Sequence, residues 1–440
     1  RSAERELAQA AFEQMSSLAY NSGYAGSTNL PAIARWPSVA AIGDGLAGVP
    51  MVIVAPGPSL ARNVDQLRAL GGRAIITAFS HSLHPLTAAG VVPDLVLTVD
   101  PQDVRYHFAG APLDAVTLVN AATAHPSLFA LPARRCLTLS ANSAIDDWIY
   151  AGLGEDAVVP GGGSVATTAY ALAQAWRCDP IIFVGLDLSF SGGQYYVATS
   201  ADGGARAAVD ARGVMQVEGW SREFHAMKAA GGPAAARERV VELPGWHGGT
   251  VPSSFMFSMF HRWFVESTRQ LTGVRVFNCT EGGAYIDGMA HRPLAEVLGA
   301  LGAPVDVEAV LARADATAGP ARAARIDAHL ARVIDGLRRC RRLAVAARTL
   351  LARGQLGPRL ERIEHALARA LAPLTVASLL AQREVERAHD LARRLEHDAD
   401  LASAEVALLG ALIEVVDQLA PALVAARARL DPRRDHGRAA

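Results

Sequence analysis

The sequence predicts an α/β protein, with a Rossmann-like, doubly wound, mostly parallel sheet followed by an all-helical C-terminal bundle. Three observations predict it. From Met51 onward, short and nearly continuous apolar runs alternate with helical stretches, as the strands of a parallel sheet covered on both faces do. Turn signals separate the runs. After Pro304 the composition shifts to Ala, Leu and Arg at helical spacing.

The expected elements divide the chain into three parts. Residues 1–48 hold a short helix, Ala3–Leu18, and a Gly-, Asn- and Pro-rich connection. Residues 49–300 form the expected sheet domain. Its strands are Met51–Ala55, Arg73–Ala78, Leu95–Val99, Val116–Val119, Leu137–Leu139, Ile181–Val184 and Val274–Phe277. Its helices include Leu60–Leu70, Leu83–Gly90 and Val165–Trp176, which complete βαβ units. Residues 301–440 form the helical bundle, to which we assign contact with a protein partner.

The regular alternation lapses between Ser189 and Gly249, where the chain is rich in Gly and Ala. So long an irregular region inside a domain is usually functional or disordered. Two interpretations stay open, a mobile flap over a site and a floppy insertion.

Composition excludes several classes of function. The 42 Lys and Arg residues balance the 43 Asp and Glu residues, which argues against a general nucleic-acid binder. The four cysteines form no Cys-x-x-Cys pair, so we expect reduced thiols in a cytoplasmic protein. The apolar run Val406–Ala426 is broken by Glu414 and Asp417. We therefore expect a packed helix there and no membrane partner.

The first chemical signal is Val52–Leu60, with the sequence Val-Ile-Val-Ala-Pro-Gly-Pro-Ser-Leu. It predicts a buried strand, a tight turn containing Gly57, and Ser59 at the N-cap of a helix. Free amides and the helix dipole favour an anion there, and Ser59 can both cap the helix and donate to a phosphate oxygen. An ordinary strand–turn–helix is the alternative, since the stretch is neither Gly-x-Gly-x-x-Gly nor a Walker A sequence.

The second signal is Asp100, at the end of the strand Leu95–Val99. Open α/β sheets bind ligands at this edge. Asp100 can accept hydrogen bonds from a ribose or base, hold a metal together with Asp103, or simply cap the helix that follows. We favour a role in ligand binding.

The third signal is a glycine-rich loop, Pro160–Thr168, in which Gly163 and Ser164 open a helix. A loop of this kind at a helix N-terminus predicts a second cradle for a phosphate or a sugar carboxylate. A plain flexible turn is the alternative. The helix leads into a strand that ends at Asp187.

In order along the chain, these residues resemble a known family. The ordered set comprises Gly57-Pro58-Ser59-Leu60, Gly163-Ser164, Gly185-Leu186-Asp187 with Tyr195 nearby, and the later stretch Phe277–Ile286. It resembles the motility-associated factor (Maf) flagellin glycosyltransferases, whose central domain is similar to the bacterial CMP-sialic acid sialyltransferases. The resemblance covers roughly residues 50–295; the helical tail fits the family only in kind.

The resemblance implies transfer of a nonulosonic acid of the pseudaminic or legionaminic type from its CMP donor to Ser or Thr of flagellin. It implies a reaction in the cytoplasm that needs no metal and no cofactor. By that likeness Gly57 and Ser59 lie along the nucleotide, Ser80 and Asp100 near the cytidine and ribose, Gly163 and Ser164 against the donor, and Tyr195 at the departing phosphate. The chain departs from the pattern at Ser189, where a second tyrosine is typical, and at Ser80, where Asn is frequent.

The transfer also needs a base for the attacking hydroxyl. Sialyltransferases of this type are similar in using a histidine, and His247 lies near the corresponding place. A histidine flanked by glycines is, however, more often a surface loop residue. Asp187 and Glu281 are the alternative bases.

Two other functions stay open. The Gly-Pro-Ser-Leu turn and Pro93-Asp94 through Asp100 also resemble 6-hydroxymethylpterin diphosphokinases, which would use ATP and Mg²⁺ held by Asp100 and Asp103. A non-catalytic protein whose helical tail docks to the flagellum is the third interpretation. The Gly163-Ser164 loop, Tyr195 and the helical tail favour the transferase.

Overall fold

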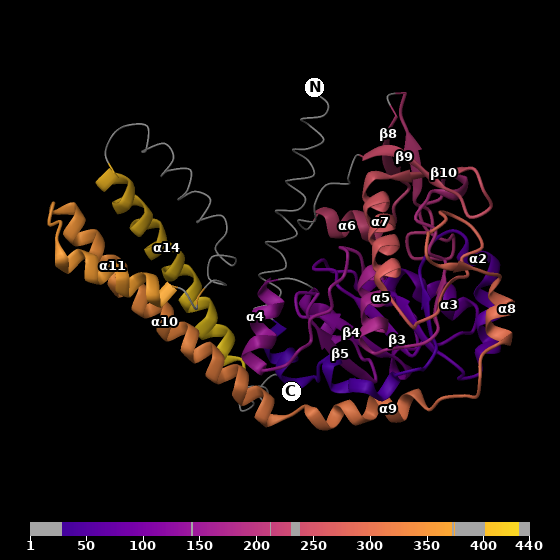
Figure 1. The fold of residues 1–440 in the computed structure, drawn as a ribbon, viewed down its shortest axis with the longest axis horizontal. Helices are drawn as coiled ribbons and strands as arrows, with labels where there is room; N and C mark the ends of the chain where they lie inside the picture. Colours follow the sequence, from indigo (N-terminus) through magenta and orange to yellow (C-terminus); the bar gives the residue numbers. More distant parts are fainter. Residues whose placement is uncertain are drawn as a thin grey trace. The chain divides into compact units, whose positions relative to one another are not determined.

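The computed structural model describes residues 29–141, 144–211, 213–229, 238–371, 374 and 401–430. The expected helix Ala3–Leu18 lies outside them. Contacts divide the chain into two compact units, whose elements are labelled in Figure 1. Among the described residues, the sheet unit comprises residues 36–141 and 156–318, and the helical unit comprises the remainder.

The sheet unit is built on one parallel sheet of eight strands with the order β12-β11-β6-β1-β2-β3-β4-β5. The strands are β1 (Met51–Val54), β2 (Ile75–Phe79), β3 (Leu95–Thr98), β4 (Thr117–Ala121), β5 (Arg135–Leu139), β6 (Ile181–Val184), β11 (Val276–Asn278) and β12 (Ala290–His291). Every residue of β1 to β6 is buried, as the continuous apolar runs require. The predicted fold class is confirmed, and each expected strand is present to within two residues of its predicted start and end.

The strand order creates a switch point between β1 and β6. The chain runs outward from β1 through β5 and then returns to the other side of β1 as β6. Val54 of β1 pairs with Val184 of β6, so both strands end at the same level. In open α/β sheets, such a reversal leaves a crevice outside the carboxyl ends of the strands, where ligands bind.

Helices and 3-10 turns precede, connect or follow these strands. They are η1 (Val39–Leu46), α2 (Leu60–Asn63), η2 (Val64–Leu70), η3 (Ser80–Ser82), α3 (Leu83–Ala88), η4 (Arg105–Phe108), η5 (Leu113–Ala115), η6 (Pro126–Ala130), α5 (Val165–Ala175), α7 (Phe255–Gln270), α8 (Leu294–Gly299), α9 (Val307–Ala314) and η8 (Asp315–Thr317). Helix α5 packs on β1, β2 and β3, and α7 packs beside α5. The helix expected over Leu60–Leu70 is divided into α2 and η2, because Asn63 leaves the helical conformation at φ −132°.

The stretch expected to be irregular contains more regular structure than the sequence indicated. It begins with η7 (Ser191–Gly193) and carries a second, antiparallel sheet of order β10-β9-β8-β7, together with α6 (Arg222–Ala229). The strands are β7 (Arg206–Val209), β8 (Val214–Glu218), β9 (Glu238–Pro244) and β10 (Thr250–Ser254). The expectation of irregular chain throughout is therefore wrong. Residues of β7 and β8 are exposed or half-buried at every position but one, so these strands lack the apolar run that predicts a buried strand.

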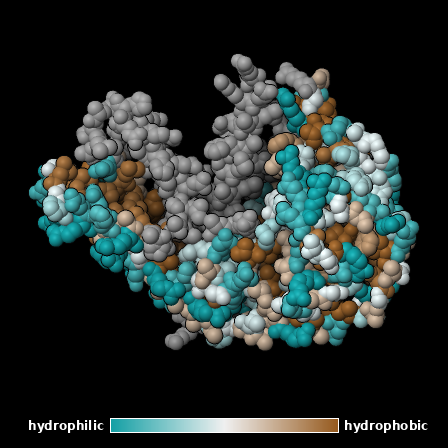
Figure 2. All heavy atoms as spheres, in the orientation of Figure 1, coloured by the Kyte–Doolittle hydropathy of each residue, from teal (hydrophilic) through white to brown (hydrophobic). Residues whose placement is uncertain are grey.

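The helical unit contains α4 (Ala144–Leu153), α10 (Pro320–Ala352), α11 (Pro358–Leu371) and α14 (Leu401–Ala428). Helix α10 packs along both α11 and α14, around a core that includes Ala347, Leu350 and Leu360. Figure 2 shows hydrophobic side chains gathered on part of this unit. From Glu405 to Ala428, α14 is long and apolar enough to cross a membrane, and 24% of its most apolar window is buried. A packed core helix meets the same criteria of length and composition.

The compact units begin and end at other residues than the three expected domains. Helix α9 belongs to the sheet unit, where Arg135 of β5 binds Glu308 and Asp315. Helix α4 belongs to the helical unit, where Glu155 pairs with the buried Arg322 of α10. These long-range ion pairs join segments that are distant in sequence.

Candidate functional site

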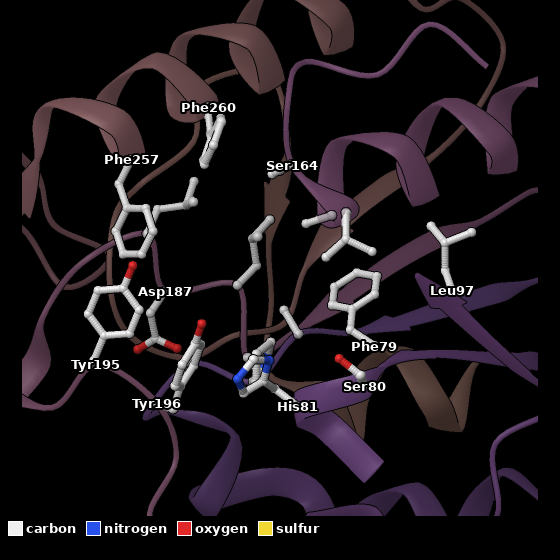
Figure 3. A pocket seen from close by; sticks show the side chains of 18 of the residues that line it. Phe79, Ser80, His81, Leu97, Ser164, Asp187, Tyr195, Tyr196, Phe257 and Phe260 are labelled. Atoms are coloured by element: carbon white, nitrogen blue, oxygen red, sulfur yellow. The ribbon is translucent and has the colours of Figure 1, made fainter. Parts of the chain in front are cut away.

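A cavity of about 510 Å³ opens at the carboxyl ends of β1, β2, β3 and β6, at the switch point (Figure 3). Its lining residues include six of the seven predicted for donor binding, namely Gly57, Ser80, Asp100, Gly163, Ser164 and Tyr195. Of the predicted bases, Asp187 also lines it. Its volume falls in the range of sites for small molecules and cofactors.

The seventh predicted residue, Ser59, is not among the lining residues. Its side chain is buried, and its hydroxyl donates to Asp187 Oδ1 over 2.6 Å and accepts from Arg62 over 2.7 Å. It makes no side-chain capping bond to α2. The expected cap of α2 by Ser59 is therefore wrong, and the hydroxyl is bonded within the protein. The contact of Ser59 with a phosphate stays a prediction.

The backbone of this first turn is also satisfied internally. The Gly57 amide donates to Gly185 O over 2.9 Å, and the Ser59 amide donates to the Asp187 carboxylate over 3.2 Å. The donors of Ser59 in this turn are thus bonded to a carboxylate of the protein itself, that of Asp187. A side chain at Gly57 would clash, since a Cβ there would lie 2.1 Å from Asp187 Oδ2. Burial raises the pKa of Asp187 to about 6, although the bonds from Ser59 act in the opposite direction.

The second glycine-rich loop faces the cavity at the start of α5. Gly163 has φ +93°, a conformation that favours glycine. Ser164 forms a capping box with Thr167, in which its side chain accepts the Thr167 amide. Val165 and Ala166 occupy the first two helical positions and line the cavity. Amides at these positions lack intrahelical partners and carry the positive end of the helix dipole, so this turn presents the anion cradle that the first turn does not.

Asp100 and Ser80 line the cavity at the ends of the neighbouring strands. Asp100 Oδ1 accepts the Gln102 amide over 2.9 Å, and Ser80 Oγ lies 2.9 Å from His107 Nδ1. Asp103 is not among the lining residues. It forms an ion pair with Arg105 at 2.6 Å, and hydrogen bonds from that guanidinium hold the pKa of Asp103 down at about 2.

An aromatic wall bounds the cavity on the side of the Ser189–Gly249 segment. Tyr195 and Tyr196 stand next to Asp187 and His81 in Figure 3. Tyr195 packs at 5.6 Å on Phe257 of α7, and the Tyr196 ring stacks on His81 at 4.2 Å. Ser189 also lines the cavity. The segment interpreted as a flap or an insertion thus supplies part of the cavity wall.

The other two predicted bases are not among the lining residues. His247 is exposed, and its Nε2 lies 3.2 Å from the backbone oxygen of Glu281. The carboxylate of Glu281 accepts the Leu294 amide over 2.9 Å. His247 and Glu281 thus contact each other, and of the three predicted bases Asp187 is the one that lines the cavity.

A polar cluster of three residues was missed by the sequence analysis. His81 lines the cavity, and its Nε2 lies 3.2 Å from Asp202 Oδ2. His107 is buried beside it, with its Nε2 3.4 Å from the same oxygen. One signal was present, because His81 follows Ser80 at the end of a buried strand. Nothing local pointed to Asp202, which lies 121 residues from His81.

Comparison with known proteins gives two findings. The 6-hydroxymethylpterin diphosphokinase MptE-like family model matches residues 26–193, less than half of the chain. The solved structure of MAf glycosyltransferase from Magnetospirillum magneticum AMB-1 is similar over 94% of this chain and 60% of that chain, with a TM-score of 0.55 and 15% identity. This chain thus spans less than two thirds of that protein. The expected likeness to Maf glycosyltransferases is confirmed for the fold. No curated protein matches the chain.

Proposed function

We propose that this chain is a glycosyltransferase that binds a nucleotide-activated donor in the switch-point cavity. The proposed donor is a CMP-linked nonulosonic acid, and the proposed acceptor is Ser or Thr of flagellin, in the cytoplasm. One observation carries the proposal. Six of the seven residues that the Maf resemblance assigns to the donor line a single cavity, in a chain whose fold is similar to that of a Maf glycosyltransferase.

The proposed donor is an anion, and the N-terminus of α5 is the part of the cavity best suited to it. The amides of Val165 and Ala166 can donate to the phosphate or to the sugar carboxylate. Asp100 can accept hydrogen bonds from the ribose, because it lies at the carboxyl end of β3. The charge that develops on the departing phosphate would then be stabilised by fixed dipoles.

The acceptor hydroxyl must lose its proton as it attacks the anomeric carbon. Position supports Asp187 over His247 and Glu281 as the base, because it alone of the three lines the cavity. Its pKa of about 6 lies close to the pH at which a general base works well. The same carboxylate also holds Ser59 in place, so its removal affects both chemistry and structure.

Binding and transfer can be tested separately. Calorimetry of the folded protein with CMP should show one site. Mass spectrometry of flagellin should show a nonulosonic acid when it is co-expressed with this chain and a CMP-nonulosonate pathway. Gly163→Val should abolish both signals, because φ +93° is strongly disfavoured for a β-branched residue. Gly302→Ala should preserve both, because a Cβ added at Gly302 meets no neighbouring atom within 4 Å. A folded protein that neither binds CMP nor modifies flagellin would refute the proposal.

The match to the MptE-like family favours a second candidate, an ATP- and Mg²⁺-dependent diphosphokinase. That chemistry would call on Asp100 and Asp103 as metal ligands. Asp103 is instead paired with Arg105 and accepts the Ser127 hydroxyl over 2.9 Å. Nucleotide preference separates the candidates. Tight binding of ATP only with Mg²⁺, lost in Asp103→Asn, supports the kinase, and binding of CMP without Mg²⁺ supports the transferase.

A further inference from the structure

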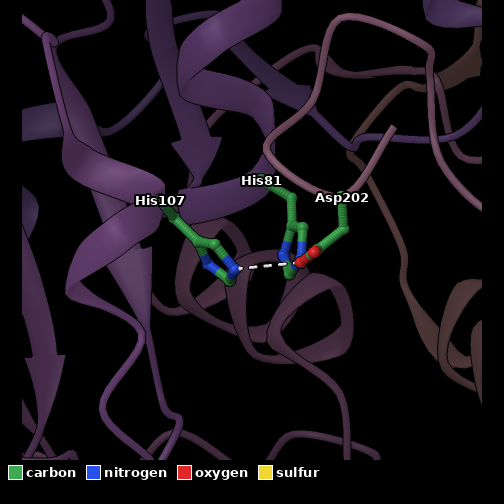
Figure 4. A group of neighbouring side chains, drawn as sticks. All are labelled: His81, His107 and Asp202. Carbon is green, nitrogen blue, oxygen red and sulfur yellow. Dashed lines mark hydrogen bonds and ion pairs between the residues drawn. The ribbon is translucent and has the colours of Figure 1, made fainter. Parts of the chain in front are cut away.

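Three side chains from three separate segments converge beside the cavity (Figure 4). His81 comes from η3, His107 from η4, and Asp202 from the turn that precedes β7. Their ligand atoms all lie within 4.8 Å of one another. The two imidazole rings are 3.8 Å apart, and both present Nε2 to Asp202 Oδ2, at 3.2 and 3.4 Å.

Hydrogen bonding within the protein does not account for the arrangement of His107. Its Nδ1 is bonded to Ser80 Oγ over 2.9 Å, but its Nε2 is buried and has no hydrogen-bond partner in the described part of the chain. In the tautomer whose Nδ1–H donates to Ser80 Oγ, the lone pair of Nε2 faces the Asp202 carboxylate. A cation between the two atoms would stabilise that contact.

We propose that His81, His107 and Asp202 bind one divalent transition-metal ion of the zinc class. Imidazole nitrogen and carboxylate oxygen are ligands that such ions prefer, and two His with one carboxylate form a common set. Two ligands each about 2.1 Å from a tetrahedral ion lie about 3.4 Å apart. The contacts of 3.2 and 3.4 Å to Asp202 match that spacing.

The residues around the cluster support the same assignment. A metal-ligating histidine usually donates a hydrogen bond from its second ring N–H to a neighbouring acceptor, and ligating carboxylates usually accept hydrogen bonds as well. His107 has this support from Ser80, and Asp202 Oδ2 accepts the Tyr106 hydroxyl over 2.9 Å.

The ion would have two effects at this place. It would fasten Asp202, and with it the Ser189–Gly249 segment that carries Tyr195 and Tyr196, to η3 and η4. It would also supply positive charge, since the residues that line the cavity include the carboxylates of Asp100 and Asp187 but no Lys or Arg. This second effect rests on the proposed anionic donor, and it departs from the expectation that no metal takes part.

The test is a titration of the full chain, stripped with a chelator, with Zn²⁺ alone and with Co²⁺ alone. We expect one equivalent of each, a Co²⁺ absorption spectrum of low coordination number, and a Tm rise of about 5 °C at a hundredfold excess of Zn²⁺ over its Kd. Proteolysis within residues 189–249 should slow when Zn²⁺ is added. His81→Gln and Asp202→Asn should weaken binding at least about a hundredfold, and Ser80→Ala about tenfold.

His84→Ala is the matched control, because His84 is a half-buried histidine nearby whose ring contacts Ala109 O and not the cluster. Its Zn²⁺ affinity should equal that of the wild type. His81 is partly exposed, so His81→Gln should fold, which circular dichroism will show. Absence of stoichiometric Zn²⁺ binding, or unchanged binding in His81→Gln, would overturn the inference. The titration needs no nucleotide, so its failure leaves the donor site standing, and a failure to bind CMP leaves the metal site standing.

Discussion

Gly57→Ala should destabilise the sheet unit, because the added methyl has no room at the switch point. The Cβ would lie 2.1 Å from Asp187 Oδ2 and 2.4 Å from Gly185 O, and the second atom is backbone that cannot rotate away. Overpacking of this kind costs about 1–3 kcal/mol. Separating the turn from β6 also breaks the bond from the Gly57 amide to Gly185 O, which is worth about 1 kcal/mol. We therefore expect a loss of about 2–4 kcal/mol in the free energy of unfolding.

The assay is urea denaturation followed by fluorescence and by circular dichroism. Gly302→Ala is the matched control, since no atom lies within 4 Å of its added Cβ, and its free energy of unfolding should stay within about 0.5 kcal/mol of wild type. Gly57→Ala should shift the midpoint at an unchanged m value. A shift no larger than that of the control would refute the packing argument and the Gly57–Gly185 contact on which it depends.

Three further predictions concern other contacts. Ser164→Ala should cost about 1 kcal/mol through loss of the capping box, as measured by urea denaturation. Burial raises the folded pKa of Asp187 above its unfolded value, so its contribution to stability is present below pH 3.8 and is lost as pH rises through about 6. The stability of wild type relative to Asp187→Asn should thus fall by up to about 3 kcal/mol from pH 4 to pH 7, and a constant difference would contradict this. Glu155→Ala should lower the free energy of unfolding of the helical unit by about 3 kcal/mol, because it leaves the buried guanidinium of Arg322 without its carboxylate partner. Arg325→Ala, which removes the exposed partner of Glu155, should lower it by less than about 1 kcal/mol.

The fold was predictable because each strand of the main sheet carries its own signal. The runs at β1 and β6 are apolar at every position, and their burial on both faces leaves little freedom of interpretation. The second sheet gives no such signal. No residue of β7 is buried, and its two middle residues are half-buried while its two end residues are exposed, so the strand carries no apolar run or alternation that would distinguish it from a loop.

The place of the cavity, at the carboxyl ends of the strands, could be predicted from the sequence, whereas most of the side-chain contacts around it could not. The turns holding Gly57 and Asp100 follow β1 and β3 of one parallel sheet, so topology alone brings them to one edge. The turn holding Gly163, at the start of α5, lines the same cavity. The partner of Ser59 is 128 residues away at Asp187, and the three residues of the histidine cluster are similarly scattered. No local pattern encodes such pairings, because they depend on how the chain returns to the sheet.

The turns at Gly57 and Gly163 look alike in sequence, since each places a serine at the start of a helix, but their hydrogen bonds differ. In the turn at Gly57, backbone amides donate to the Asp187 carboxylate and to Gly185 O, and these bonds join β1 to the segment that follows β6. The turn at Gly163 satisfies its serine within α5 and leaves the first helical amides facing the cavity. Substitutions in the first turn should therefore lower stability before they affect binding. Substitutions in the second should weaken binding of an anion while costing less stability than those in the first, about 1 kcal/mol for Ser164→Ala. A reversed order of effects would show that the anion binds at the first turn instead.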